Sequence, residues 1–241
     1  MQAVILAGGK GRRLRPYTTV LPKPLMPLGE MPIIEVVLRQ LAASGFCQVT
    51  VAVGYLAELL MAYCGDGRKF GLDLSYSREE TPLGTAGPLA LIDGLAGGDS
   101  FLVMNGDVLT SLDFAALVQR HQASGAAATI ATHQRQQQIN YGIIESDDAD
   151  RVTAYIEKPQ YHYQVSMGVY VLTPAVLEYI PRDHYLDLPD LVRTLMAAGR
   201  PVRAYPFDGY WLDIGRHDDY EQAMEEFEAM RPMLLGAGER L

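Results

Sequence analysis

The sequence has little cysteine and no long apolar run. Two cysteines, Cys47 and Cys64, occur in 241 residues and form no Cys-x-x-Cys pair, so we expect unpaired thiols in a reducing compartment. No apolar stretch approaches the roughly 18 residues needed to span a bilayer. Met1-Gln2-Ala3 leads directly into a strand-like run without a signal-peptide pattern. We therefore expect a cytoplasmic protein that does not contact a membrane.

Basic residues are outnumbered. The chain has 20 Lys and Arg against 29 Asp and Glu, a net charge of −9, which argues against general nucleic-acid binding. Hydrophobic residues make up 49%, enough for a sizeable core. Four bases nevertheless follow Gly11 within thirteen positions, namely Arg12, Arg13, Arg15 and Lys23. Such a local cluster in an acidic chain predicts a binding site for an anion.

Several common catalytic and binding motifs are absent. The P-loop requires Ser or Thr after its lysine, but Gly11 follows Lys10. The dinucleotide fingerprint requires a third glycine, where this chain has Leu14. The five histidines lack zinc-site spacing, and no Gly-x-Ser-x-Gly elbow is present. These patterns give no support to a zinc site or a serine hydrolase.

What is present is a glycine-rich loop after a strand-like run. Residues 3–6 are apolar and open into Gly8-Gly9-Lys10-Gly11. Glycines let the backbone approach a ligand and turn several N–H groups towards one point. With the bases that follow, the loop predicts a site for a polyanion such as a nucleoside triphosphate. A simple turn is the alternative interpretation of the loop by itself.

Short strand-like runs alternate with amphipathic helical stretches in the first half of the chain. This rhythm predicts an α/β fold with a Rossmann-like, mixed but mainly parallel sheet flanked by helices. Ligands bind beyond the carboxyl ends of such strands. Those ends carry Gly8-Gly9 and Asn105-Gly106-Asp107. The elements expected here are strands over 2–7, 49–53, 72–77 and 101–104 and helices over 33–43, 57–63 and 86–95.

The rhythm changes after about residue 110. Four strand-like runs follow a helix over 112–123, and we expect them to complete the sheet in antiparallel or mixed fashion and to cover one side of the site. Residues 202–207 and 210–212 resemble the two strands of a hairpin. We find no linker or repeat, so we expect a single domain over 1–241. Its nucleotide-binding part would be 1–110 and its sugar-phosphate-binding part 111–230, and no C-terminal β-helix is expected.

Two carboxylates are candidates for binding a metal. Asp107 follows an apolar strand and two small residues, and Asp213 lies in Trp211-Leu212-Asp213-Ile214-Gly215, which holds the single tryptophan. An acid in such an apolar setting is costly unless it is paired or metal-bound. One or two carboxylates suffice for Mg²⁺. Each aspartate has an alternative role as the cap of a following helix.

Two lysines lie next to prolines. Lys23 is flanked by Pro22 and Pro24, and Lys158 lies in Glu157-Lys158-Pro159. Proline restricts the backbone around each lysine, so each could present a fixed positive charge to a phosphate. An exposed surface lysine is the alternative for Lys158.

Together these segments resemble the sugar-1-phosphate nucleotidylyltransferases, or nucleotide-sugar pyrophosphorylases. The signature is Leu6-Ala7-Gly8-Gly9-x-Gly11-x-Arg13-Leu14-x-Pro16-x-Thr18 followed by Pro22-Lys23-Pro24. The resemblance continues in order from residue 3 to about 225. Its further segments are Pro82-Leu83-Gly84-Thr85-Ala86-Gly87, Asn105-Gly106-Asp107, Tyr141-Gly142, Glu157-Lys158-Pro159 and Trp211-Leu212-Asp213-Ile214-Gly215.

The resemblance implies a nucleotide-diphospho-sugar transferase fold and a Mg²⁺-dependent reaction of a nucleoside triphosphate with a sugar 1-phosphate, giving an NDP-sugar and pyrophosphate. It implies catalytic roles for Arg13, Lys23 and Asp107, and Mg²⁺ ligation by Asp107 and Asp213. The implied nucleotide-binding residues are Leu6, Ala7, Gly8, Gly9, Gly11, Arg13, Pro82, Gly84, Gly87 and Asp107. The implied sugar-phosphate-binding residues are Asn105, Tyr141, Gly142, Glu157, Lys158, Gly168 and Asp213.

The resemblance specifies the nucleobase and the sugar less closely than it specifies the reaction. The segment 83–87 is more similar to the mannose-1-phosphate guanylyltransferase branch, so GTP with mannose 1-phosphate is the first expectation. Thymidylyl or uridylyl transfer to glucose 1-phosphate stays open, and a homo-oligomer, dimer or tetramer, is expected from the resemblance. Two other classes also remain: a glycosyltransferase that uses an NDP-sugar, and a silent nucleotide-sugar sensor. Lys10, Arg12 and Arg15 receive no role.

Overall fold

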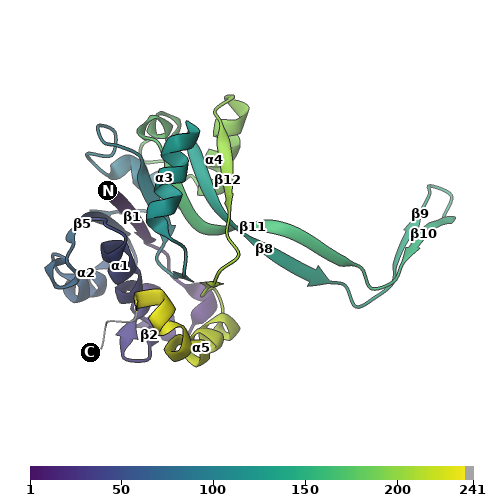
Figure 1. The fold of residues 1–241 in the computed structure, drawn as a ribbon, viewed down its shortest axis with the longest axis horizontal. Coiled ribbons are helices and arrows are strands. Elements are labelled where there is room, and N and C mark those ends of the chain that lie inside the picture. Colours follow the sequence, from purple (N-terminus) through teal and green to yellow (C-terminus); the bar gives the residue numbers. More distant parts are fainter. Residues whose placement is uncertain (237–241) are drawn as a thin grey trace.

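A seven-stranded mixed sheet forms the centre of the molecule (Figure 1). The computed structural model describes residues 1–236. In spatial order the strands are β12 (Val202–Pro206), β8 (Ala128–Gln138), β11 (Gln160–Leu172), β6 (Phe101–Asn105), β1 (Gln2–Ala7), β4 (Gln48–Val53) and β5 (Asp73–Arg78). The pairs β6–β1, β1–β4, β4–β5 and β12–β8 are parallel, whereas β11 is antiparallel to both of its neighbours. The expected Rossmann-like, mainly parallel α/β fold is confirmed.

Helices cover both faces of the sheet. The α-helices are α1 (Ile33–Ala43), α2 (Ala57–Cys64), α3 (Phe114–Ser124), α4 (Leu188–Ala197) and α5 (His217–Leu235). Ile5 belongs to the core that α1, α2 and α3 share, while its neighbour Val4 belongs to the core containing α4. Successive side chains of a strand point to opposite faces, so an almost continuous apolar run such as β1 is typical of a strand buried on both sides.

A third apolar cluster supports the glycine-rich loop and the segment after it. Phe227 and Ala223 of α5 pack with Leu14 and Met26, and all four are buried. The C-terminal helix therefore holds the N-terminal basic segment in place. The short elements are η1 (Arg12–Leu14), η2 (Tyr17–Thr19), η3 (Lys23–Leu25), β2 (Pro27–Leu28), β3 (Met31–Pro32), η4 (Arg68–Phe70), η5 (Gly87–Leu91), β7 (Val108–Thr110), η6 (Pro174–Tyr179) and β13 (Trp211–Asp213).

Strands β8 and β11 continue beyond the sheet as a two-stranded ribbon. Figure 1 shows this ribbon leaving the body and carrying a small hairpin, β9 (Ile143–Ser146) and β10 (Val152–Ile156), at its far end. We call residues 133–165 the arm. The expectation that this part of the chain covers one side of the site is wrong for the arm, because the β8–β11 ladder runs away from the body.

Two local predictions are also wrong. The helix expected over 86–95 is a 3-10 helix over Gly87–Leu91 followed by turns, and glycines at 94, 97 and 98 remove any helical continuation. The hairpin expected over 202–212 does not form. Instead β12 pairs in parallel with β8, and β13 pairs with β7. The division of the chain at residue 110 stays a prediction.

Candidate active site

The glycine-rich loop lies directly beyond the carboxyl end of β1. A Cβ on Gly9 would meet no atom within 4 Å, so this part of the backbone borders open space. Gly11 has a φ of 55°, a left-handed conformation suited to glycine. Thr18 is buried and donates its hydroxyl to the Gly11 carbonyl at 2.8 Å. The Thr18 hydrogen bond thus fixes one side of the loop, and the side that borders open space is free for a ligand.

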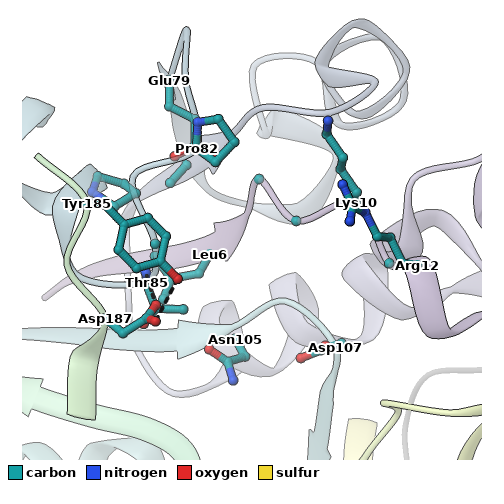
Figure 2. Close-up of a pocket in the computed structure, with 16 residues that line it drawn as sticks. Leu6, Lys10, Arg12, Glu79, Pro82, Thr85, Asn105, Asp107, Tyr185 and Asp187 are labelled. Carbon is teal, nitrogen blue, oxygen red and sulfur yellow. Dashed lines mark hydrogen bonds between the residues drawn. The ribbon is translucent and has the colours of Figure 1, made fainter. Parts of the chain in front are cut away.

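A cleft of about 690 Å³ opens above the loop and the end of β6. In Figure 2, Lys10 and Arg12 lie at one end, Tyr185 and Asp187 at the other, and Asn105 and Asp107 along the floor. The cleft is lined by Leu6, Gly8, Gly9, Lys10, Gly11, Arg12, Ala52, Glu79, Pro82, Gly84, Thr85, Pro88, Asn105, Asp107, Tyr185 and Asp187. Its position at the carboxyl ends of parallel strands is the expected place for a ligand in an open α/β sheet.

A smaller cavity of about 260 Å³ continues from the cleft towards the bases. The two cavities share Leu6, Gly9, Gly11, Arg12 and Asp107. The smaller one adds Ala7, Arg13, Lys23, Pro24 and Gly106. The space therefore leads from the open cleft to a positively charged end, as a molecule with an anionic tail requires.

The charged groups predicted from the sequence converge at that end. Lys23 forms an ion pair with Asp107, and their side chains are 11% and 21% exposed. Asp213 interacts electrostatically with Asp107, Lys23 and Arg13. Asp107 is not a helix cap, because Asp113 caps α3 by accepting the Ala116 N–H at 2.9 Å. Asp213 lies within β13, so its alternative role as a cap is excluded too.

The carboxylates at 107 and 213 fit a divalent cation. Burial raises the pKa of Asp213, the Asp107 carboxylate adds to this rise, and the Lys23 and Arg13 cations oppose it. Oδ1 of Asp107 is buried and has no hydrogen-bond partner in the protein. A cation between the carboxylates would satisfy this oxygen and relieve their repulsion. Among residues 1–236 no group of three or more His, Cys, Asp or Glu forms a metal cluster, so the site offers two protein carboxylates at most.

The opposite wall of the cleft is built by residues that sequence reasoning missed. Oδ1 of Asp187 accepts hydrogen bonds from the Thr85 N–H at 3.0 Å and the Thr85 hydroxyl at 3.1 Å. Tyr185 donates to Oδ2 of Asp187 at 2.8 Å. Because Thr85 and Asp187 are separated by 102 positions, no local pattern could have found this contact.

Glu79 is a further wall residue without a sequence signal. It accepts the Leu83 N–H at 3.0 Å, and burial raises the pKa of its carboxyl group. Its side chain also lies so close to Gly8 that a Cβ there would clash. A side chain at position 8 would therefore displace the Glu79 carboxylate from its present position, whereas Gly9 is the glycine that leaves space beside it.

Most of the residues predicted to bind the nucleotide line the two cavities. Gly87 is the exception: it is buried behind the wall, where a Cβ would meet the His184 carbonyl oxygen at 2.7 Å. The absence of a side chain at Gly87 lets this segment pack closely against the segment that contains His184. The residues that do line a cavity are Leu6, Ala7, Gly8, Gly9, Gly11, Arg13, Pro82, Gly84 and Asp107.

The residues predicted to bind the sugar phosphate are divided between two places. Asn105 lines the cleft, and Gly168 contacts it, since a Cβ on Gly168 would lie 2.6 Å from Nδ2 of Asn105. Asp213 lies with the charged cluster. Tyr141, Gly142, Glu157 and Lys158 instead lie on the arm, away from the cleft of the same chain. The order of motifs gives the positions of these residues along the sequence, but it does not give the direction in which the β8–β11 strand pair leaves the sheet.

Solved structures identify the class of fold. The chain superposes on HddC from Yersinia pseudotuberculosis with a TM-score of 0.72 and 24% identity, over 94% of this chain and 99% of that one. It also superposes on a structure described as a glucose-1-phosphate thymidylyltransferase from Bacillus anthracis, with a TM-score of 0.76 and 22% identity over 100% of this chain and 97% of that one. The fold is therefore the Rossmann-like fold of the nucleotidyltransferases. The chain belongs to the nucleotidyl transferase family, whose model matches residues 2–230.

Two relatives show the range within the family. A UTP–glucose-1-phosphate uridylyltransferase from Synechocystis sp. is 37% identical over 93% of this chain and 62% of its own length. A mannose-1-phosphate guanylyltransferase from Mycobacterium tuberculosis is 33% identical over 100% of this chain and 69% of its own length. The chain thus spans about three fifths to two thirds of the length of these relatives.

In the part that the structure describes, no helix is both long and apolar enough to cross a membrane.

Proposed function

We propose that the protein transfers a nucleotidyl group from a nucleoside triphosphate to a sugar 1-phosphate, releasing pyrophosphate in a Mg²⁺-dependent reaction. The observation that carries this proposal is the convergence of Lys23, Asp107, Asp213 and Arg13 at one end of a cleft built on a glycine-rich loop. Family membership and the names of both relatives support the same reaction class.

The reaction needs little proton chemistry, since a sugar phosphate is already a nucleophile. Its barrier lies in bringing two polyanions together in line. Fixed cations lower that barrier by positioning the reactants and stabilising the developing charge. Arg13 would neutralise the leaving pyrophosphate, and Lys23 would bind at the phosphorus under attack. Asp107 and Asp213 would hold Mg²⁺, which supplies charge neutralisation and orientation of the phosphates.

The far end of the cleft would hold the nucleobase, beside Pro82 and Gly84. We propose GTP as the nucleotide and mannose 1-phosphate or a related sugar as the acceptor. The guanylyltransferase relative supports this choice, and the wall carboxylate of Glu79 adds to it. A carboxylate accepts two hydrogen bonds side by side, and guanine offers two adjacent N–H donors. The uridylyltransferase relative keeps UTP and glucose 1-phosphate as the second candidate pair.

Pyrophosphate release tests the proposal directly. The purified chain would be incubated with each of four nucleoside triphosphates and several sugar 1-phosphates, with and without Mg²⁺. We expect release with one preferred pair, dependent on both the metal and the sugar phosphate. Absence of release across the whole panel would contradict the proposal and favour a sensor. An NDP-sugar that is consumed rather than formed would indicate a glycosyltransferase.

The environment of the cysteines supports a cytoplasmic location, which we also propose. Cys47 is exposed and Cys64 is buried, and both are free thiols. Burial raises the pKa of the Cys64 thiol to about 11, so it stays protonated and unreactive at neutral pH. An exposed free thiol persists best in a reducing compartment.

A further inference from the structure

The arm has no core of its own. Seven of the sixteen large hydrophobic side chains that are exposed in residues 1–236 lie on it: Tyr141, Ile144, Val152, Tyr155, Ile156, Tyr161 and Tyr163. An isolated two-stranded ribbon is marginally stable in water, and a concentration of exposed apolar side chains marks a surface that another molecule covers. The arm therefore needs a partner.

The composition of the ribbon matches a protein interface. Residues 133–138 and 160–165 contain glutamine, histidine and tyrosine, and Arg135 is the single Lys, Arg, Asp or Glu among these twelve positions. Interface cores are depleted of charge and enriched in aromatic residues and arginine. A ribbon built for contact with water alone would carry Lys and Glu at such positions.

Contacts with the body fix the direction in which the arm leaves the sheet. His133 hydrogen-bonds the Phe207 carbonyl at 2.9 Å, and its ring lies 5.4 Å from that of Trp211. The guanidinium of Arg135 lies 4.8 Å from the same Trp211 ring. The β8–β11 pairing then continues without interruption from Thr132 to Gln138. A turn back onto its own cleft would break this ladder, so the arm does not reach its own site.

The outer end of the ribbon holds a structured polar cluster. Tyr155 packs against the backbone of Gly142 and hydrogen-bonds Glu157 at 3.2 Å. Nζ of Lys158 lies 3.9 Å from the Glu157 carboxylate. Lys158 has a φ of 43°, which is strained for a residue with a side chain and doubly so before Pro159. Such strain clusters at binding and catalytic sites, yet neither the cleft nor the smaller cavity of the same chain is lined by residues of this cluster.

The positive charges of the cleft all come from one short segment of the chain. The bases that line the two cavities are Lys10, Arg12, Arg13 and Lys23, all of them from the first 23 residues. Lys23 is already paired with Asp107. At the Asn105 side of the cleft the lining side chains are neutral or acidic. An anionic second substrate bound beside Asn105 would have Lys23 near it, but that lysine is already paired with Asp107, so a further cation would strengthen the binding.

We infer that the protein forms a symmetric dimer by arm exchange, in which the arm of each copy lies across the other and places Lys158 and Glu157 at the cleft of that second copy. Reciprocal exchange of one element is a low-cost route to a closed twofold assembly. The ribbon, about 20 Å long beyond the sheet at ~3.3 Å per residue, has the reach for such a crossing. Dimerisation rests on the arm alone, whereas the role of Lys158 at the second cleft rests on the proposed function.

The first experiment concerns assembly and needs no activity. Sedimentation velocity should show a dimer for the full chain and a monomer for Ile144→Asp. Met196→Asp is the matched control, because Met196 is exposed to a similar extent, 62% against 59%, on α4 of the body. Amides of β9 and β10 should exchange slowly in the dimer and fast in Ile144→Asp. A monomeric full chain, or loss of the dimer in Met196→Asp alone, would overturn the inference.

The second experiment determines whether Lys158 acts at the cleft of its own chain or at the cleft of the second copy. Chains carrying Lys158→Ala and Asp107→Asn would be co-expressed with different tags, and the mixed dimer isolated on both tags. At a sugar 1-phosphate concentration below KM, each homodimer should be strongly impaired. The mixed dimer should regain about half of the wild-type rate, since one of its two symmetric sites is intact.

The outcomes separate the two levels of inference. A mixed dimer as impaired as its parents would show that each arm serves its own cleft, and would overturn the exchange at the site. A dimer that turns over no substrate pair, even as wild type, would refute the proposed function and leave the sedimentation result to decide the exchange.

Discussion

Strands β8 and β11 are buried at one end and exposed at the other, although a single ladder joins both ends. Inside the body, Ala128, Ala131, Val171 and Leu172 are buried between helices on both faces of the sheet. In the arm, residues 134–138 of β8 and 160–164 of β11 are exposed. Backbone pairing alone therefore does not provide a core. The body obtains its core from its own helices, and the arm must obtain burial from outside the chain.

The two regions also divide the candidate site between them. The body holds the glycine-rich loop and the Lys23–Asp107 pair, and the arm holds Lys158 and Glu157. Substitutions in the body should therefore affect folding or turnover. Substitutions in the arm should affect assembly and the binding of the second substrate.

The largest expected effect is a stability difference along β11 itself. Leu172 is fully buried and Tyr161 is 42% exposed. Leu172→Ala should lower the free energy of unfolding by about 2–5 kcal/mol, through lost burial and the cavity left behind. Tyr161→Ala should change that free energy by less than about 1 kcal/mol at a protein concentration where the chain is monomeric. Urea unfolding measures both, and equal losses would show that the arm has a core of its own.

The next effect is on turnover in the body. Asp107→Asn keeps an oxygen that can accept from Lys23 but removes the charge that holds a cation. We expect kcat to fall by about 100-fold or more, with little change in the thermal melting point. Asp148→Asn, at the exposed tip of the arm, is the matched control and should retain wild-type kcat. Near-normal turnover of Asp107→Asn would remove this residue from the metal site.

A smaller effect is expected from the arm cluster. Lys158→Ala should raise KM for the sugar 1-phosphate by about tenfold and leave kcat nearly unchanged, because it removes a binding charge outside the reacting centre. KM for the nucleotide should stay constant. Arg151→Ala, on the turn between β9 and β10, removes another arm charge and serves as control. Equal effects of the two substitutions on KM would indicate long-range electrostatics and would contradict a direct contact of Lys158.

The smallest effect is a pH dependence confined to the body. His121 is buried and hydrogen-bonded to Thr129 at 2.8 Å, and burial lowers its pKa from 6.5. The unfolded chain then binds a proton more readily than the folded one. The stabilisation is complete above pH 6.5 and is lost as the pH falls towards the folded pKa, by at most ~1.4 kcal/mol per pH unit.

Urea unfolding at pH 7.5 and 5.5 would measure this dependence, with His121→Gln as the comparison. The wild-type chain should lose more stability on acidification than the variant. The arm histidine His162 is exposed, and His162→Gln should change the pH dependence of unfolding by less than His121→Gln does. Identical pH profiles for wild type and His121→Gln would contradict a neutral buried imidazole.

Local chemistry made much of the body predictable. A strand that ends in glycines, and an aspartate two positions after another strand, carry their meaning within a few residues. The alternation of strands and helices then places such ends along one edge of the sheet. Thus the fold class, the loop at Gly8–Gly11 and the position of Asp107 at a strand tip followed from sequence.

Contacts between distant segments and the direction of the arm were decided by the tertiary structure. The Lys23–Asp107 pair joins positions 84 apart, and Thr85 meets Asp187 across 102 positions. Neither separation leaves a trace in local pattern, because each depends on how the sheet and its covering segments pack. Motif order predicts Tyr141 and Lys158 as site residues, but the β8–β11 ladder, with Arg135 against Trp211 at its base, carries both away from their own chain's cleft. The sequence determined which groups the protein has, and packing determined where they meet.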